Sequence, residues 1–227
     1  MMRLFSPHQD LNIVYPHPVD PSRPLFYVTD SVHILKCVRN NCLNQKNTGR
    51  CFFPDIQSIY DKVHVSGASF DVLCKLHASE EENLSKYAYG LTCKALQPST
   101  LQRQNVKLAF KVFSIFVEEA SKTRGVSMNL DYASSTAELI GIIRKWWSVV
   151  NVKTPKKGRR LNDDLQNPVS CMFDPQKEHF SSVVDWLDTW KIIQMDTGIL
   201  TGETHSSAAY IICADRSHKV MFGGVEV

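Results

Sequence analysis

The chain has 227 residues, of which 43% are hydrophobic and 22% are charged, and it carries a formal net charge of +3 at pH 7. This composition is typical of a soluble, globular chain that can bury one sizeable core or two small ones. The mild positive charge permits a nucleic-acid partner without arguing for one. The sequence contains neither a signal peptide nor a membrane-spanning run, so no membrane partner is expected.

Seven cysteines are scattered from Cys37 to Cys213, and no Cys-x-x-Cys pair occurs among them. An odd number of scattered cysteines fits reduced thiols in a nuclear or cytosolic protein better than a disulfide framework. The alternative is a zinc site with ligands drawn from Cys37, Cys42, Cys51, His64 and His77. Because the spacing of these residues matches no standard structural zinc site, buried free thiols are the preferred interpretation.

The first predicted elements are a strand and a helix. Prolines keep the chain extended as far as position 24, and the apolar residues from Leu25 to Thr29 predict a buried strand. Asp30 and Ser31 then offer an N-cap to a helix with an apolar stripe of Val32, Ile34, Leu35 and Val38. A carboxylate at the end of a strand is also a frequent metal ligand in phosphoryl-transfer sites. Asp30 is therefore either a helix cap or a metal ligand.

A polar stretch from Asn41 to Ser66 separates this first helix from the next periodic segment, and it predicts a loop. Residues 105–120 then show helical periodicity in their hydrophobic side chains. They predict a single core helix with an apolar face formed by Val106, Leu108, Phe110, Val112, Phe113, Phe116 and Val117.

Two further helices are predicted towards the C-terminus. A Ser135-x-x-Glu138 capping box predicts the start of one helix, which ends near Val150. Residues 176–193 predict the other, and its buried stripe comprises Phe180, Val183 and Leu187 with either Trp190 or the adjoining Trp186. Because no alternating strand pattern occurs between positions 55 and 195, this whole part is predicted to be all-α.

The most informative polar stretch runs from Asn151 to Asp164. It holds five cations around Pro155 and Gly158, namely Lys153, Lys156, Lys157, Arg159 and Arg160. One interpretation is a solvated loop whose charges complement the dipole of the preceding helix. The other is a site where the cations contact phosphates of a nucleotide or of DNA, while Asn151 supplies directional hydrogen bonds.

A series of short motifs extends these observations along the chain. The series begins with residues 17–30 and continues with Leu91-Thr-x-Lys94, Arg103-Gln-Asn-Val106, Trp147-x-x-x-Asn151-Val-Lys153, Asp185-Trp-Leu-x-x-Trp190 and Leu200-Thr-x-Glu203-Thr204. In this order, the motifs resemble the central segment of P-element-type DDE transposases and their THAP-domain relatives. The resemblance covers most of the chain, which makes it more specific than any single motif.

The resemblance implies a mainly α fold, in which an all-α helical insertion domain is attached to a fragment of an RNase H-like α/β fold. That fragment would consist of one strand and one helix. Residues 1–43 would form the partial RNase H-like segment, and residues 44–199 would form the GTP-binding insertion domain. Residues 200–227 would begin the C-terminal RNase H-like part.

The resemblance also implies that the basic stretch binds the nucleotide. Asn151 and Lys153 match the family pattern, and the implied site is completed by Ser148, Lys156, Lys157 and Arg160. Relatives tend to carry an acid at the position of Ser148, where it would accept hydrogen bonds from guanine N1 and N2. The serine therefore leaves the choice between guanine and adenine open. No P-loop motif occurs, so hydrolysis of GTP is not expected.

Catalysis in such transposases requires three acids that together hold Mg²⁺ ions. Asp30 matches the second acid, which makes it the implied catalytic residue and metal ligand. The first acid is expected on a strand upstream of Met1. The third is expected in a segment where a Leu-Glu pair precedes Phe-Gly, but no such pair precedes Phe222-Gly223. The chain is therefore interpreted as a fragment that is not catalytic alone.

These features leave three functional hypotheses. The leading one is a truncated, transposon-derived transposase fragment in the nucleus, which binds GTP, helps to engage transposon DNA and forms a homo-oligomer. The second is part of an active Mg²⁺-dependent transposase that flanking sequence completes. The third is a host module that binds DNA or protein through its helical part. No N-terminal zinc module of Cys and His occurs, so DNA targeting of the THAP type is not expected.

Overall fold

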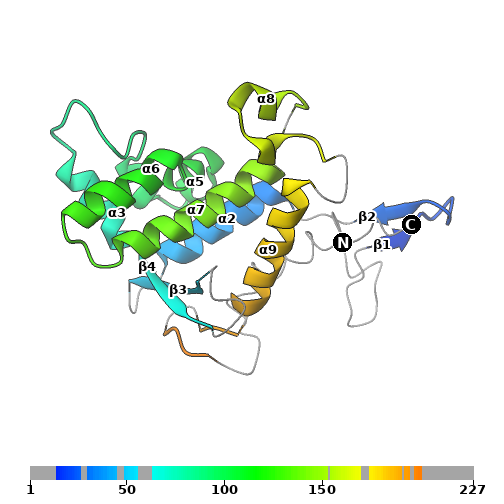
Figure 1. Ribbon diagram of the computed structural model, residues 1–227, viewed down its shortest axis with the longest axis horizontal. Coiled ribbons are helices and arrows are strands. Elements are labelled where there is room, and N and C mark those ends of the chain that lie inside the picture. The colour runs from blue at the N-terminus through cyan, green and yellow to red at the C-terminus, as the bar shows by residue number, and fades with distance from the viewer. Residues whose placement is uncertain are drawn as a thin grey trace.

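The computed structural model describes residues 14–26, 30–44, 49–55, 63–152, 154–169, 174–190, 192–194 and 197–200. In these ranges, helices form one body, and two short antiparallel hairpins accompany it (Figure 1). The buried hydrophobic residues of the helices and of the second hairpin make a single core. The described part of the chain is therefore mainly α, as predicted.

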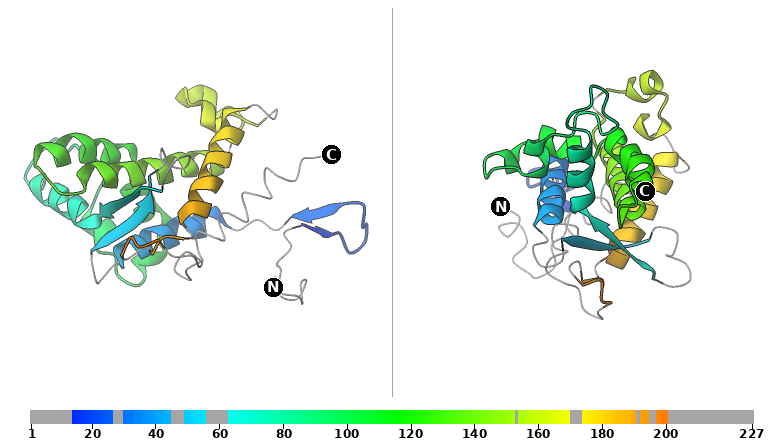
Figure 2. Two further views of the ribbon diagram at one scale, coloured as in Figure 1. Left: turned by 60° about the horizontal axis from the view of Figure 1, so that its bottom comes forward. Right: turned by 90° about the vertical axis from the view of Figure 1, so that its left-hand side faces the viewer.

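The first hairpin pairs β1 (Val14–Pro16) with β2 (Pro24–Phe26), so that Tyr15 lies opposite Leu25. It stands apart from the helical body (Figure 2). The prediction of a buried strand is wrong for Leu25, which is 37% exposed, because the described residues provide β2 with one partner strand and no layer to cover it. Residues 27–29 of the predicted strand lie outside the described residues.

Helix α2 (Ser31–Leu43) begins as the sequence predicts. The Asp30 carboxylate accepts a hydrogen bond of 2.9 Å from the backbone N–H of Val32, which is the geometry of an N-cap. Ile34 and Leu35 are buried, and the helix packs against α5 (Val106–Val112) and α7 (Ala133–Val150). The capping prediction for Asp30 is confirmed.

The second hairpin joins β3 (Arg50–Pro54) to β4 (Val65–Ser69). It corrects the all-α prediction for residues 44–199 and part of the predicted loop. Apart from Val65, β4 lacks β-branched and aromatic residues, so local propensity does not reveal it. Gly67 helps the strand to fit, because a Cβ there would lie 3.2 Å from Phe52 and 3.3 Å from Tyr132.

The outer edge of β3 is covered by two tryptophans of α9 (Pro175–Trp190). The indole N–H of Trp186 donates to the carbonyl of Pro54 over 2.7 Å, and that of Trp190 donates to the carbonyl of Phe52 over 2.7 Å. These bonds satisfy carbonyls that an edge strand would otherwise leave unpaired. Helix α9 buries the stripe predicted for it, so this prediction is confirmed.

The predicted helix over residues 105–120 is interrupted. Helix α5 ends at Val112, and α6 (Ile115–Ala120) starts after Ser114, whose hydroxyl accepts from the N–H of Val117. The break changes the direction of the apolar face. Phe110 and Phe116 are therefore 46% and 50% exposed, which corrects the prediction that both are core residues.

Helix α7 begins at Ala133, and its preceding residue, Tyr132, has a left-handed backbone with φ of 65°. The predicted capping box is wrong, because Ser135 donates its hydroxyl to the carbonyl of Gly67 instead. The next residue, Thr136, accepts from the backbone N–H of Ser69 over 3.0 Å. A tertiary bond to β4 thus uses the Ser135 hydroxyl that the sequence assigns to capping, and Thr136 adds a second bond to the same strand.

The remaining elements are short. After β4 come α3 (Phe70–Ser79), α4 (Cys93–Leu96) and the 3₁₀ turn η1 (Gln102–Gln104). A π-helical turn, η2 (Ser121–Gly125), continues α6. Beyond α7 lie α8 (Lys157–Leu161) and the 3₁₀ turn η3 (Asp164–Gln166). None of the described helices combines the length and hydrophobicity needed to cross a membrane.

Candidate functional site

The predicted site residues fall into two separate places. Asp30 is exposed at the start of α2, where its carboxylate caps the helix. Ser148, Asn151 and Lys157 instead line one pocket at the C-terminal end of α7, and Asp30 is not among its lining residues. Within the described ranges, no group of three His, Cys, Asp or Glu side chains is placed to hold a metal ion.

The pocket at the end of α7 has a volume of about 370 Å³, within the range of small-molecule sites. Its walls come from α5, α6, α7, α8 and the segment around η3. The lining residues are Phe110, Ser114, Ile115, Phe116, Arg144, Trp147, Ser148, Asn151, Lys157, Leu161, Asp163 and Gln166. We call this cavity the α7 pocket.

Ser148 and Asn151 are held by the last turns of α7. The hydroxyl of Ser148 donates to the carbonyl of Lys145 over 2.8 Å, and the N–H of Asn151 donates to the carbonyl of Trp147 over 3.0 Å. Lys157 Nζ lies 3.0 Å from the carbonyl oxygen of Asn151. This contact places a cation at the carboxyl end of the helix, where the dipole favours positive charge.

Arg144 adds a second cation to the wall, which the sequence analysis did not identify. Its Nε donates to Glu118 Oε2 over 2.7 Å. Burial alone would raise the pKa of the Glu118 carboxyl, but hydrogen bonds from Lys122 and Arg144 outweigh it and hold that pKa below its usual value. Glu118 is therefore ionised at neutral pH and fixes the Arg144 guanidinium beside the pocket.

Aromatic side chains form another part of the wall. Phe110 and Phe116 reach it because the chain breaks between α5 and α6, and Trp147 reaches it from α7. Aromatic faces of this kind can stack on a planar base. Helical periodicity alone assigns Phe110 and Phe116 to the core, so the sequence gives no signal for this role.

The segment around η3 contributes Asp163, the only carboxylate among the described lining residues. Asp163 Oδ1 accepts from the backbone N–H of Leu165 over 3.1 Å, and its other oxygen accepts from Gln166 Nε2. Gln166 is 6% exposed, and its Oε1 has no hydrogen-bond partner in the described part of the chain. In the sequence, Asp163 is recognisable only as part of a polar stretch.

A second, shallower pocket of about 440 Å³ adjoins the first through a shared residue, Lys157. It is lined by Thr154, Lys156, Lys157, Arg159 and Arg160, so four of its five side chains are cations. We call it the basic α8 surface. Lys153, which also belongs to the predicted site, lies outside the described residues.

Gly158 is what allows α8 to lie against the segment after η3. A Cβ at this position would overlap the side-chain oxygen of Asn167 and lie 2.7 Å from its backbone nitrogen. The glycine thus permits a close approach that holds the basic α8 surface next to the α7 pocket.

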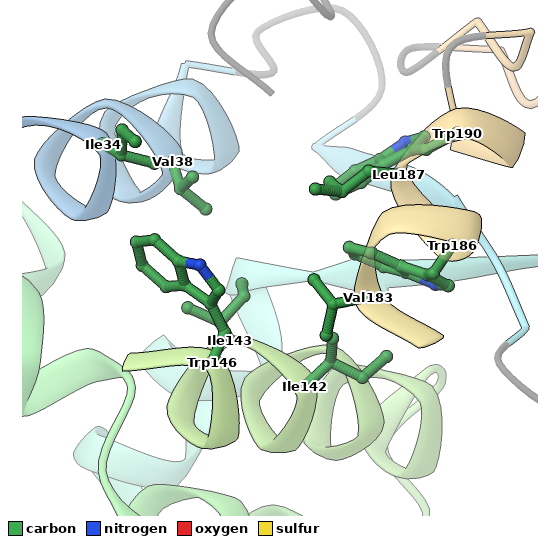
Figure 3. Close-up of a pocket in the computed structure, with 9 residues that line it drawn as sticks. All are labelled: Ile34, Val38, Ile142, Ile143, Trp146, Val183, Trp186, Leu187 and Trp190. Carbon is green, nitrogen blue, oxygen red and sulfur yellow. The ribbon is translucent and has the colours of Figure 1, made fainter. Parts of the chain in front are cut away.

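A third pocket lies between α2, α7 and α9, and it is much smaller, at about 40 Å³ (Figure 3). All its lining side chains are hydrophobic, for example Val38, Ile142 and Val183. Of the three tryptophans in its wall, Trp186 and Trp190 donate their N–H groups to carbonyls of β3. This pocket is a packing gap in the core without groups for chemistry or for polar recognition.

Comparison with known proteins gives one informative similarity. No protein-family model matches the chain, and no curated protein matches it significantly. The solved Drosophila P element transposase strand transfer complex matches with a TM-score of 0.66 and 18% identity, over 95% of this chain and 43% of that chain. The present chain thus spans less than half of that transposase chain. At this identity the likeness concerns the fold, and the chain has a P element transposase-like fold.

Proposed function

We propose that the chain is a transposase-related protein of the P element type whose helical part binds the purine nucleotide GTP. The base would enter the α7 pocket and stack on its aromatic side chains. Asn151 would hydrogen-bond the base or ribose, and the triphosphate would extend over Lys157 onto the basic α8 surface, towards Lys156 and Arg160.

One observation carries this proposal: Lys157 belongs to both pockets. A cavity large enough for a base and lined by aromatic groups therefore opens beside a surface of four cations. A nucleotide has two matching parts, because its planar base is attached to a polyanionic phosphate chain. A basic loop that is only solvated would not account for the aromatic cavity beside it.

DNA is the second partner that we propose. The neighbour with the same fold is a transposase in a strand transfer complex, and cations near Lys156 would contact phosphates there as well. This role implies a nuclear location and oligomerisation. For strand transfer, Asp30 would serve as a Mg²⁺ ligand together with acids from sequence beyond this chain.

Isothermal titration calorimetry of the chain with GTP and with ATP, each with Mg²⁺, tests the nucleotide proposal. We expect saturable GTP binding that weakens roughly tenfold or more in Asn151→Ala and Lys157→Met, because each variant loses a polar or charged contact to the ligand. Reversal of Lys156 and Arg160 to glutamate should weaken binding further.

Lys94→Met is the matched control for the Lys157 variant, because Lys94 is an exposed lysine of α4 outside both pockets. It should leave the affinity unchanged. If Lys94→Met and Lys157→Met lowered the affinity for GTP equally, the effect of Lys157 would be one of general charge attraction. No binding of either nucleotide by a folded chain would overturn the proposal.

A further inference from the structure

Two side chains in the lining of the α7 pocket, Ser148 and Asp163, present hydrogen-bond acceptors. Ser148 commits its hydroxyl proton to the carbonyl of Lys145, so only the lone pairs of its oxygen remain available. Asp163 is an acceptor in its ionised form. These two groups of the lining thus offer acceptors rather than donors to a ligand.

Asp163 is held firmly in its place. The backbone N–H of Leu165 and the side-chain amide of Gln166 each donate to one carboxylate oxygen, which leaves further lone pairs on both oxygens. The bond to Asp163 also orients the Gln166 amide, because a flipped amide would turn its oxygen towards the carboxylate. Gln166 Oε1 is consequently an acceptor at the pocket wall.

Gln166 Oε1 is buried and has no hydrogen-bond partner among the residues that the structure describes. A buried acceptor without a donor is costly in a folded protein, and a donor brought by a ligand would remove that cost. This observation is independent of the position of Asp163, and it points to a ligand with donors on the edge that meets η3.

We propose that Asp163, oriented by Gln166, selects guanine in this pocket. The inference rests on the proposed nucleotide-binding function. Guanine presents two donors on one edge, N1–H and the N2 amino group, and a carboxylate can accept from both. Adenine presents a lone pair at N1, which the same carboxylate repels. The pocket would therefore prefer GTP to ATP roughly tenfold to a hundredfold.

Asp163→Asn tests this assignment with little disturbance of the fold, since asparagine also accepts from a backbone N–H at an N-cap position. Its amide offers one acceptor and one donor, which complement xanthine N1–H and O2. In calorimetry the variant should bind GTP roughly tenfold to a hundredfold more weakly than the wild type does, and it should bind xanthosine triphosphate more tightly than the wild type does.

Asp164→Asn is the matched control, because it makes the same change one residue later, at a side chain that does not line the pocket. It should keep the wild-type preference, and thermal unfolding should show that both variants remain folded. If wild-type protein binds GTP but Asp163→Asn leaves the affinities for GTP, ATP and xanthosine triphosphate unchanged, the assignment of Asp163 is wrong while nucleotide binding stands. If the folded wild type binds no purine nucleotide, both fail.

Discussion

Asp30 has one observed role and one proposed role, and a single pair of substitutions can separate them. Its carboxylate caps α2 through the N–H of Val32, and it is also the residue proposed to hold Mg²⁺ in a complete transposase. Asparagine caps a helix about as well as aspartate does, whereas alanine does not. Capping therefore depends on an oxygen acceptor, while metal binding depends on the charge.

We expect Asp30→Ala to lower the free energy of unfolding by about 1 kcal/mol, and Asp30→Asn to leave it nearly unchanged. For a chain of this size, the alanine variant should lose about 2–4 °C in Tm. Differential scanning calorimetry of the two variants checks this. Equal Tm values for wild type and Asp30→Ala would show that the observed bond does not stabilise the helix.

His179 makes the stability of the chain depend on pH. Burial, with the nearby charge of Lys145, lowers its pKa from 6.5 to about 4, and its Nε2 is buried without a hydrogen-bond partner among the described residues. The imidazole of His179 therefore binds a proton near pH 6.5 in the unfolded chain, whereas in the folded chain it binds one only near pH 4. Stability is fully present above pH 6.5 and is lost as the pH falls towards 4.

The loss from this residue should amount to about 2 kcal/mol between pH 7 and pH 5. Urea unfolding at a series of pH values measures it, and His179→Gln should flatten the profile over that interval. His17→Gln, in the first hairpin, should retain the wild-type slope. A profile that His179→Gln does not change would mean that other groups cause the dependence.

At the level of elements, the contact between α9 and β3 depends on two indole N–H groups. Replacement of either tryptophan by phenylalanine keeps an aromatic ring but removes the donor to Pro54 or Phe52. The carbonyl that meets Trp186 lies in buried surroundings, whereas the one that meets Trp190 is partly exposed and can recruit water.

Trp186→Phe should therefore destabilise the chain by roughly 1–3 kcal/mol from the lost hydrogen bond, and Trp190→Phe should destabilise it less. Denaturant unfolding of the two variants gives the comparison directly. The reverse order of effects would indicate that ring volume, rather than the N–H groups, controls this contact.

The interruption between α5 and α6 is an element that periodicity does not predict. The spacing of Val106, Phe113 and Val117 is consistent with one continuous helix, and the side chain of Ser114 does not by itself break it. In the folded chain Ser114 caps α6 instead. The break releases Phe110 and Phe116 from the core, so that both can line the α7 pocket.

For the whole molecule, nucleotide binding should appear as stabilisation. A ligand at one hundred times its Kd raises the free energy of unfolding by about 2.7 kcal/mol, which corresponds to several degrees in Tm for a chain of this size. We expect this shift with GTP and Mg²⁺, a smaller one with the same concentration of ATP, and a shift reduced to about half or less with GTP in Lys157→Met. Thermal shift measurements check it. Equal shifts in wild type and Lys157→Met would place the binding elsewhere.

The sequence by itself determined the features that depend on neighbours along the chain. The cap at Asp30, the end of α7 near Val150 and the stripe of α9 are all local, because helical periodicity and capping involve residues within about one or two turns of each other. The motif order likewise pointed to the P element transposase-like fold, which the solved structure shares.

Only the tertiary structure decided the pairing of β3 with β4 and the composition of the α7 pocket. Strand β4 has weak local propensity, and β3 is completed by indole groups from α9, more than 130 residues further along the chain. The pocket gathers Phe110, Arg144 and Asp163 from different elements. Contacts between residues so far apart in sequence arise from packing of the core, and local patterns do not encode them.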